Sequence, residues 1–247
     1  MPHSTPYPSC MWCGERANSR EHAIPGWMSK RLGIKEQLIS RSSRGMPQAR
    51  HPISFGSYRK RIFCKACNTH YKHLEDAAIP LIEPMAWGRQ AISLEGDSQS
   101  LIALWAAKTG MALLAASGLA DLIPKDQRDT VRYSSQPPAE SWVGYFNWTG
   151  GPNVWVGDSD LAAVSPAPPT RGQAYKAIFS FKRAAFMLIG FIDPVPVGFR
   201  IGSRADHPYS QAWPVLPGLM HWPPTGEPAN AAAMPDIVRY APTLPAN

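Results

Sequence analysis

The stretch Cys64–Asn68 (CKACN) decides how the 247-residue chain is interpreted. It contains the second of two C-x-x-C pairs; the first is Cys10–Cys13 (CMWC), and the chain has no other cysteine. Each pair places two thiolates on one turn, and two such turns supply the four tetrahedral ligands of a closed structural zinc site. A redox-active C-x-x-C needs only one pair in a thioredoxin-like βαβ context, a pattern that does not surround these cysteines. We therefore expect a structural Zn²⁺ held by Cys10, Cys13, Cys64 and Cys67.

Basic residues are concentrated in the part of the chain that carries the cysteines. Residues 1–75 contain 13 Lys and Arg against 4 Asp and Glu, whereas residues 76–247 contain 12 against 14. This asymmetry predicts that a polyanion, most simply nucleic acid, meets the N-terminal segment. A solvated basic surface without a partner would have the same composition. With 44% hydrophobic and 17% charged residues, the chain is apolar enough to bury a core.

An acid and a histidine, Glu21 and His22, lie next to one another between the two cysteine pairs. Phosphodiester hydrolysis needs a base that activates water and a cation at the scissile phosphate. An imidazole titrates near neutral pH and can be that base. A carboxylate binds Mg²⁺, and the amide oxygen of Asn68, directly after the last cysteine, can be a second ligand. Most Glu-His dipeptides are surface pairs. What favours a catalytic role here is the position of the dipeptide between the two C-x-x-C turns, which we call the first knuckle (Cys10–Cys13) and the second knuckle (Cys64–Cys67).

Taken together, these motifs resemble the HNH endonuclease family in its zinc-stapled variant. The matching features are C-x-x-C at 10–13, Glu21–Pro25 (EHAIP), C-x-x-C-N at 64–68 and a downstream Leu74-Glu75. The resemblance covers roughly residues 10–76 and implies a ββα-metal finger. It also implies that His22 is the general base, that Glu21 binds a catalytic Mg²⁺ or Mn²⁺, and that Asn68 completes that metal site.

One element of the family pattern, its middle Asn, has no counterpart here, because residues 40–63 contain no Asn. Ser54, Ser57 or a backbone carbonyl would take its place in orienting the base. His70 and His73 lie three residues apart, so on a helix they share a face. One of them could be an extra metal ligand or contact a phosphate, or both are simply exposed polar residues. Glu75, seven residues after Asn68 on the same helix face, is expected to support the site or to cap a local charge.

Basic side chains around the second knuckle are expected to contact a phosphate backbone, although a solvated strand face would look the same. These residues are Arg41, Arg44, Arg59, Lys60, Arg61 and Lys72.

Hydrophobic periodicity and turn residues predict the local structure. We expect a short helix over 25–32, a hairpin or two edge strands over 53–63, and a helix from the second knuckle that ends at Pro80. The clearest helix covers 99–122, with Asp97 or Ser98 as its N-cap, and is expected to be buried.

The second half of the chain has the texture of a β-rich region. Seventeen of the 26 prolines fall in 134–247. Apolar runs at 142–148, 154–157, 174–181, 186–192 and 212–216 read as strands. Gly150–Asn153 is interpreted as a hairpin turn, and Lys182-Arg183 as the separator of two further strands.

The expected fold class is therefore α+β, with two parts. A zinc-bound ββα-metal finger occupies 1–80. An accessory region, 81–247, contains the long helix, a small mainly antiparallel β region and a Pro-rich C-terminal tail. The accessory region would select the target, position the substrate or mediate homodimerisation. No apolar run is long enough to span a bilayer and no apolar signal core is present, so we expect a cytoplasmic protein without a membrane partner.

The expected function is a metal-dependent endonuclease that hydrolyses phosphodiester bonds in nucleic acid, with DNA as the expected substrate. By analogy alone, such modules suit phage, mobile-element or defence proteins. The alternative is a non-catalytic zinc-finger nucleic-acid-binding protein, and a third hypothesis is a zinc-stabilised interaction protein with an incidental basic surface.

Overall fold

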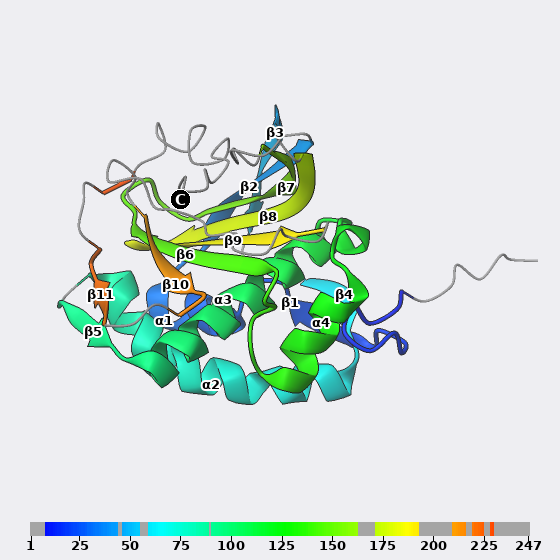
Figure 1. Ribbon diagram of the computed structural model, residues 1–247, viewed down its shortest axis with the longest axis horizontal. Helices are drawn as coiled ribbons and strands as arrows, with labels where there is room; N and C mark the ends of the chain where they lie inside the picture. Colours follow the sequence, from blue (N-terminus) through cyan, green and yellow to red (C-terminus); the bar gives the residue numbers. More distant parts are fainter. Residues whose placement is uncertain are drawn as a thin grey trace, which may run out of the picture.

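The computed structural model shows a mixed sheet lying over a layer of helices (Figure 1). The structure describes residues 8–43, 46–54, 59–88, 90–162, 171–192, 209–215, 219–224 and 228–229. Within these ranges, the main sheet has seven strands in the order β10-β6-β9-β8-β7-β2-β3. Their bounds are β2 Glu36–Ser43, β3 Met46–Ser54, β6 Ser141–Asn147, β7 Asn153–Ala162, β8 Arg171–Phe181, β9 Ala184–Phe191 and β10 Tyr209–Trp213. Neighbours are antiparallel except β2 and β7, which run parallel.

A small strand pair accompanies the cysteines. β1 (Ser19–His22) pairs antiparallel with β4 (Arg59–Phe63), with Ser19 opposite Phe63 and His22 opposite Arg59. The long helix α2 (Lys65–Trp87) begins directly after β4. Between β1 and β4 the chain forms α1 (Gly26–Leu32), β2 and β3. The two strands and the helix that follows them therefore give a strand–strand–helix arrangement, while β2 and β3 join the main sheet.

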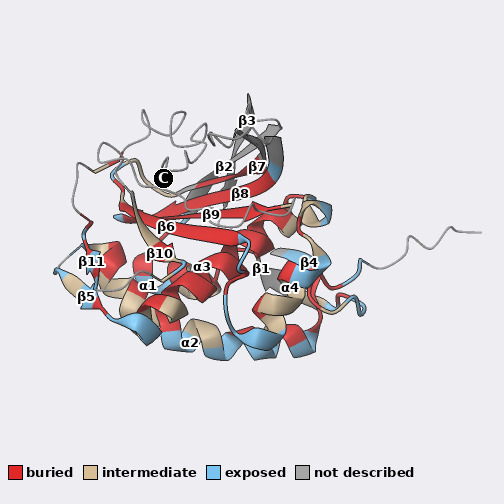
Figure 2. Cartoon of the chain, in the orientation of Figure 1, coloured by how far each residue is buried: buried red, intermediate tan, exposed pale blue. Residues whose placement is uncertain are grey.

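The helix α3 (Gly96–Ala116) forms the centre of the core, as the burial colouring in Figure 2 shows. Every residue from 102 to 114 is buried. A Cβ on Gly110 would lie 2.9 Å from Leu188 Cδ2, so only glycine allows this close approach to β9. Contrary to the expectation that no apolar run could span a bilayer, this helix is by length and composition long and apolar enough to cross a membrane, but 78% of its apolar stretch is buried inside the fold. Its hydropathy therefore reflects its place in the core.

One buried cluster extends from Cys10 to Trp222. The segments predicted as separate parts, 1–80 and 81–247, thus share a core as well as a sheet. The remaining described elements are β5 Ile92–Leu94, which pairs with β11 Met220–Trp222, and the helical segments η1 Ala120–Leu122, α4 Lys125–Asp129 and η2 Thr130–Ser134.

Several local predictions are confirmed. The structure has α1 within 25–32, strand at 53–54 (the end of β3) and at 59–63 (β4), and the turn at Lys182-Arg183 between β8 and β9. The predicted tail at 222–247 lies almost entirely outside the described residues.

Three predictions are wrong. First, α2 continues through Pro80 and Pro84 to Trp87, because buried side chains such as Ile82 and Met85 hold its second half against the core. Second, α3 begins after Glu95 and ends at Ala116, earlier than its apolar pattern suggests. Third, Gly150–Asn153 does not close a hairpin, since β6 pairs with β9 and β10 while β7 pairs with β8 and β2.

Candidate metal centre and neighbouring strands

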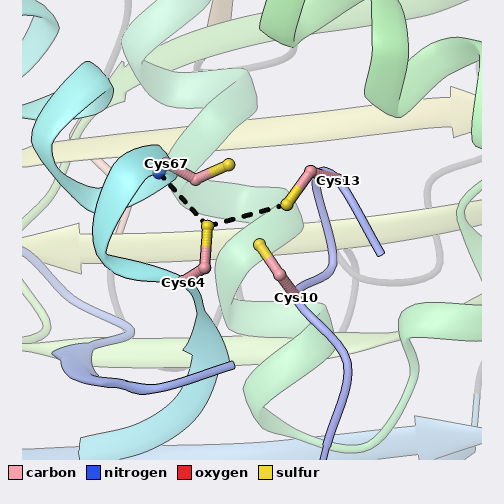
Figure 3. Close-up of side chains that lie close together, drawn as sticks. All are labelled: Cys10, Cys13, Cys64 and Cys67. Carbon is pink, nitrogen blue, oxygen red and sulfur yellow. Dashed lines mark hydrogen bonds between the residues drawn. The ribbon is translucent and has the colours of Figure 1, made fainter. Parts of the chain in front are cut away.

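The four cysteines point toward one another at the start of α2 (Figure 3). Their Sγ atoms all lie within 4.8 Å of one another, and those of Cys13 and Cys64 are 3.6 Å apart. All four are free thiols. In a tetrahedral site with Zn–S bonds of about 2.3 Å, ligand sulfurs lie about 3.8 Å apart. The cysteines therefore lie close enough to hold a metal ion such as zinc, which agrees with the predicted ligand set.

Backbone hydrogen bonds shape the first knuckle. The N–H of Gly14 donates to the carbonyl of Cys10 at 2.9 Å, and Gly14 has a φ of 77°, a conformation that favours glycine. The N–H of Met11 donates to the carbonyl of Ile62 at 2.9 Å. This second bond joins the knuckle to β4, just before the second cysteine pair.

The second knuckle forms the N-terminus of α2. Cys64 is the N-cap, and its Sγ accepts from the N–H of Cys67 at 3.4 Å. The side-chain oxygen of Asn18 accepts from the N–H of Lys65 at 2.9 Å, so a residue before β1 caps this helix. Sequence reasoning missed Asn18, because no local pattern pairs it with Lys65, which lies 47 residues later.

The surroundings shift the pKa values of Cys64, Cys67 and Cys13 in different directions. Burial alone would raise the pKa of Cys64, but the N–H of Cys67 and the neighbouring thiols lower it to about 7. Burial raises the pKa of Cys67 and, to a smaller extent, that of Cys13. Zinc binds thiolates, so metal binding here must release protons and depend on pH.

Aromatic rings and one ion pair surround the centre. The ring centroids of Trp12 and Tyr71 lie 4.9 Å apart. Lys108 Nζ lies 5.7 Å from the ring centroids of both Tyr71 and Phe63, and 2.5 Å from Glu75 Oε1. Glu75 was predicted to support the site or to cap a local charge; in the structure it pairs with a lysine of α3. Lys108 is the sole charged residue between 98 and 120. A single charge in an apolar helix is the sequence signal that points to a buried ion pair.

The predicted catalytic residues lie on adjoining elements. Glu21 and His22 occupy β1, where their backbone pairs with Lys60 and Arg59 of β4. Their side chains lie outside what the structure describes. Asn68 is half-buried in the first turn of α2, and its N–H donates to the carbonyl of Cys64 at 3.0 Å. Because α2 contacts β1, the backbone brings the strand with Glu21-His22 beside the helix with Asn68.

The predicted phosphate contacts are described in part. Lys60, Arg61 and Lys72 are exposed, and Lys72 forms an ion pair with Asp76. Arg44 and the side chains of Arg41 and Arg59 lie outside the described residues.

The histidine pair faces a different feature of the surface. His70 and His73 line an open hollow of about 480 Å³ between α2 and α3. Among the described residues, no third potential ligand joins them in a metal cluster.

The fold and the site define a class: a mixed helix-and-sheet protein with a four-cysteine centre able to hold a metal ion. Comparisons of the chain with protein-family models, with curated proteins and with solved structures found no match. A function for this chain is therefore inferred from its own residues and their geometry.

Proposed function

We propose that this protein is a metal-dependent endonuclease of the HNH type, in which zinc on the four cysteines staples a ββα-metal finger. One observation carries the proposal. The strand with Glu21-His22 pairs with β4, and β4 runs directly into the second knuckle and Asn68. This order of elements around a four-thiol cluster is what the ββα-metal finger requires.

In the proposed reaction, His22 accepts a proton from the attacking water. Glu21 and Asn68 offer a carboxylate and an amide oxygen, a donor set that suits a hard divalent cation. Mg²⁺ or Mn²⁺ bound there supplies positive charge to stabilise the phosphate in the transition state. Lys60 and Arg61, both exposed, hold the phosphate backbone beside β4.

A second candidate function is nucleic-acid binding without cleavage. The exposed Lys60, Arg61 and Lys72 lie on elements of the proposed finger, and such a surface suits phosphate contact alone. The lack of any Asn in residues 40–63 also favours this candidate, because the Asn that orients the base in the family pattern is absent and a pure binder has no need of it.

The test compares cleavage of plasmid DNA, single-stranded DNA and RNA in Mg²⁺, Mn²⁺ or EDTA. Wild type is compared with His22→Ala, Asn68→Ala and a matched control, His73→Ala, which removes an exposed imidazole from α2. We expect metal-dependent cutting that falls about 100-fold or more in His22→Ala and is unchanged in His73→Ala. Salt-sensitive binding with no cutting in any metal would favour the binding protein. Equal cutting by wild type and His22→Ala would exclude His22 as the base.

A further inference from the structure

A helical segment that follows the core helix lies against the metal centre. α4 passes into the π-helical turn η2 without a break, since Asp129 and Thr130 both have right-handed helical backbone angles. Arg128 and Arg132 are four residues apart on this segment, so they lie on the same side, about one turn apart.

Arg128 makes a direct contact with the first knuckle. Its Nη1 donates to the carbonyl oxygen of Met11 at 2.8 Å, and the contact is partly buried. Met11 lies between Cys10 and Cys13, so this hydrogen bond fixes the turn that carries both thiols. The Arg128 guanidinium belongs to a part of the chain more than one hundred residues later, so the contact is long-range.

Arg132 is held in place by its neighbour. Its guanidinium carbon lies 4.6 Å from the ring centroid of Tyr133, and Nη1 donates to the Tyr133 hydroxyl at 2.6 Å. Partial burial alone would lower the pKa of Arg132, but the thiols of Cys67 and Cys13, together with Tyr133, raise it. Because Arg132 follows Arg128 by one helical turn, it lies on the side of the segment whose Arg128 contacts the first knuckle.

A four-thiolate zinc centre carries a net charge of −2, and Cys10 and Cys67 are almost fully buried. Buried charge is costly unless it is paired. The nearby buried cation Lys108 is already paired with Glu75. The two arginines on α4 and η2 supply positive charge on the side of the first knuckle.

We propose that Arg128 and Arg132 are outer-shell positioning residues of the metal centre, which hold the first knuckle and balance the charge of the thiolates. The inference rests on the four-cysteine zinc site of the proposed function. It gives the segment after residue 80 a defined task, because that segment completes a site whose ligands all precede Asn68. Outer-shell partners of this kind typically change metal affinity by about 10–100-fold when removed.

The experiment measures zinc retention by the full chain, with no cleavage assay. Zinc-loaded wild type, Arg128→Met and Arg132→Met are titrated with a chromophoric chelator at fixed pH, and zinc release is also followed as the pH is lowered. The matched control is Lys125→Met, which removes an exposed lysine of α4 that pairs with Asp129. Arg132→Lys keeps the charge and separates charge from shape.

We expect both Met variants to bind zinc about 10–100-fold more weakly and to release it at higher pH, with Arg132→Lys in between and Lys125→Met like wild type. A zinc affinity within twofold of wild type in both Met variants would overturn the inference. A wild-type chain that binds no zinc would instead overturn the metal centre itself. Should Arg132→Met fail to fold, Tyr133→Ala decides for Arg132: Tyr133 is 68% exposed, so its loss spares the core while freeing Arg132. Should Arg128→Met fail to fold, Arg128→Lys decides for Arg128, because it keeps the charge but removes Nη1, which donates to Met11. Weaker zinc binding in the deciding variant supports the role of that arginine, and unchanged binding overturns it.

Discussion

The ion pair between Glu75 and Lys108 is the contact whose loss we expect to weaken the link between α2 and α3 most. Its atoms are 2.5 Å apart, and the Lys108 side chain is 2% exposed while that of Glu75 is 18% exposed. In Glu75→Gln, the buried ammonium would keep only a neutral amide and the ring faces of Phe63 and Tyr71. Removing one partner of a buried pair costs about 3–5 kcal/mol. The ring contacts and the partial exposure of Glu75 reduce the expected loss to about 2–3 kcal/mol.

Urea denaturation of the zinc-loaded chain measures this loss as a lower midpoint at an unchanged m-value. The matched control is Asp76→Asn, which breaks the Lys72–Asp76 pair on the same helix. Both partners of that pair are more than half exposed, so its loss should cost less than about 0.5 kcal/mol. The double variant Glu75→Leu with Lys108→Met removes both charges and should recover most of the stability.

Two results would refute this reasoning. If Glu75→Gln were no more destabilising than Asp76→Asn, Lys108 would not be a buried charge that depends on Glu75. If the double variant were as unstable as the single one, packing rather than charge would explain the loss.

Three further predictions concern stability. Burial lowers the pKa of Lys176 to about 7, against 10.5 unfolded, so the unfolded chain binds more protons between these values. The free energy of unfolding should therefore rise by about 1.4 kcal/mol per pH unit from pH 7 towards pH 10, and Lys176→Met should remove this slope in urea titrations. Asn18→Ala removes the acceptor of the Lys65 N–H, a capping contact that adds to the Cys64 N-cap of α2, and should lower stability by about 1 kcal/mol in thermal melts; an unchanged melt would refute this contribution. Gly190→Ala would place a Cβ 1.9 Å from the buried Tyr175 ring and should destabilise by about 1–3 kcal/mol, whereas Gly96→Ala meets nothing within 4 Å and should not.

The candidate site was more predictable from sequence than the fold. Two C-x-x-C pairs in a chain with no other thiol predict the four-cysteine cluster, because each pair fixes half of it locally. The helix that starts at the second knuckle follows from an equally local signal. The partners of the site, Lys108 and Arg128, come from distant helices, and their contacts depend on the tertiary arrangement.

Two of the three errors in the fold, those at Pro80 and at Gly150–Asn153, share one physical cause, which is that tertiary packing overrides local signals. Pro80 lacks an N–H and disfavours a continuing helix, yet the buried face of α2 carries the helix through it. A Gly-Gly-Pro turn between two strands usually predicts a hairpin, but Gly150–Asn153 links strands that are separated by β9 and β8. No local pattern tells a strand which partner it will take, and β2 pairs with β7 across more than one hundred residues.

The parallel pairing of β2 with β7 has a consequence for how the chain reaches its native state. Both cysteine pairs leave the ribosome before β7 is made, so the thiols are available while β2 and β3 still lack their neighbour. Non-local pairings of this kind slow folding, because loop closure precedes the contacts that stabilise it. A fragment that ends at residue 80 would expose the β2 edge, which invites pairing with other chains. The cysteine centre is therefore best studied in the whole chain. A smaller fragment would need a short turn in place of the β2–β3 segment.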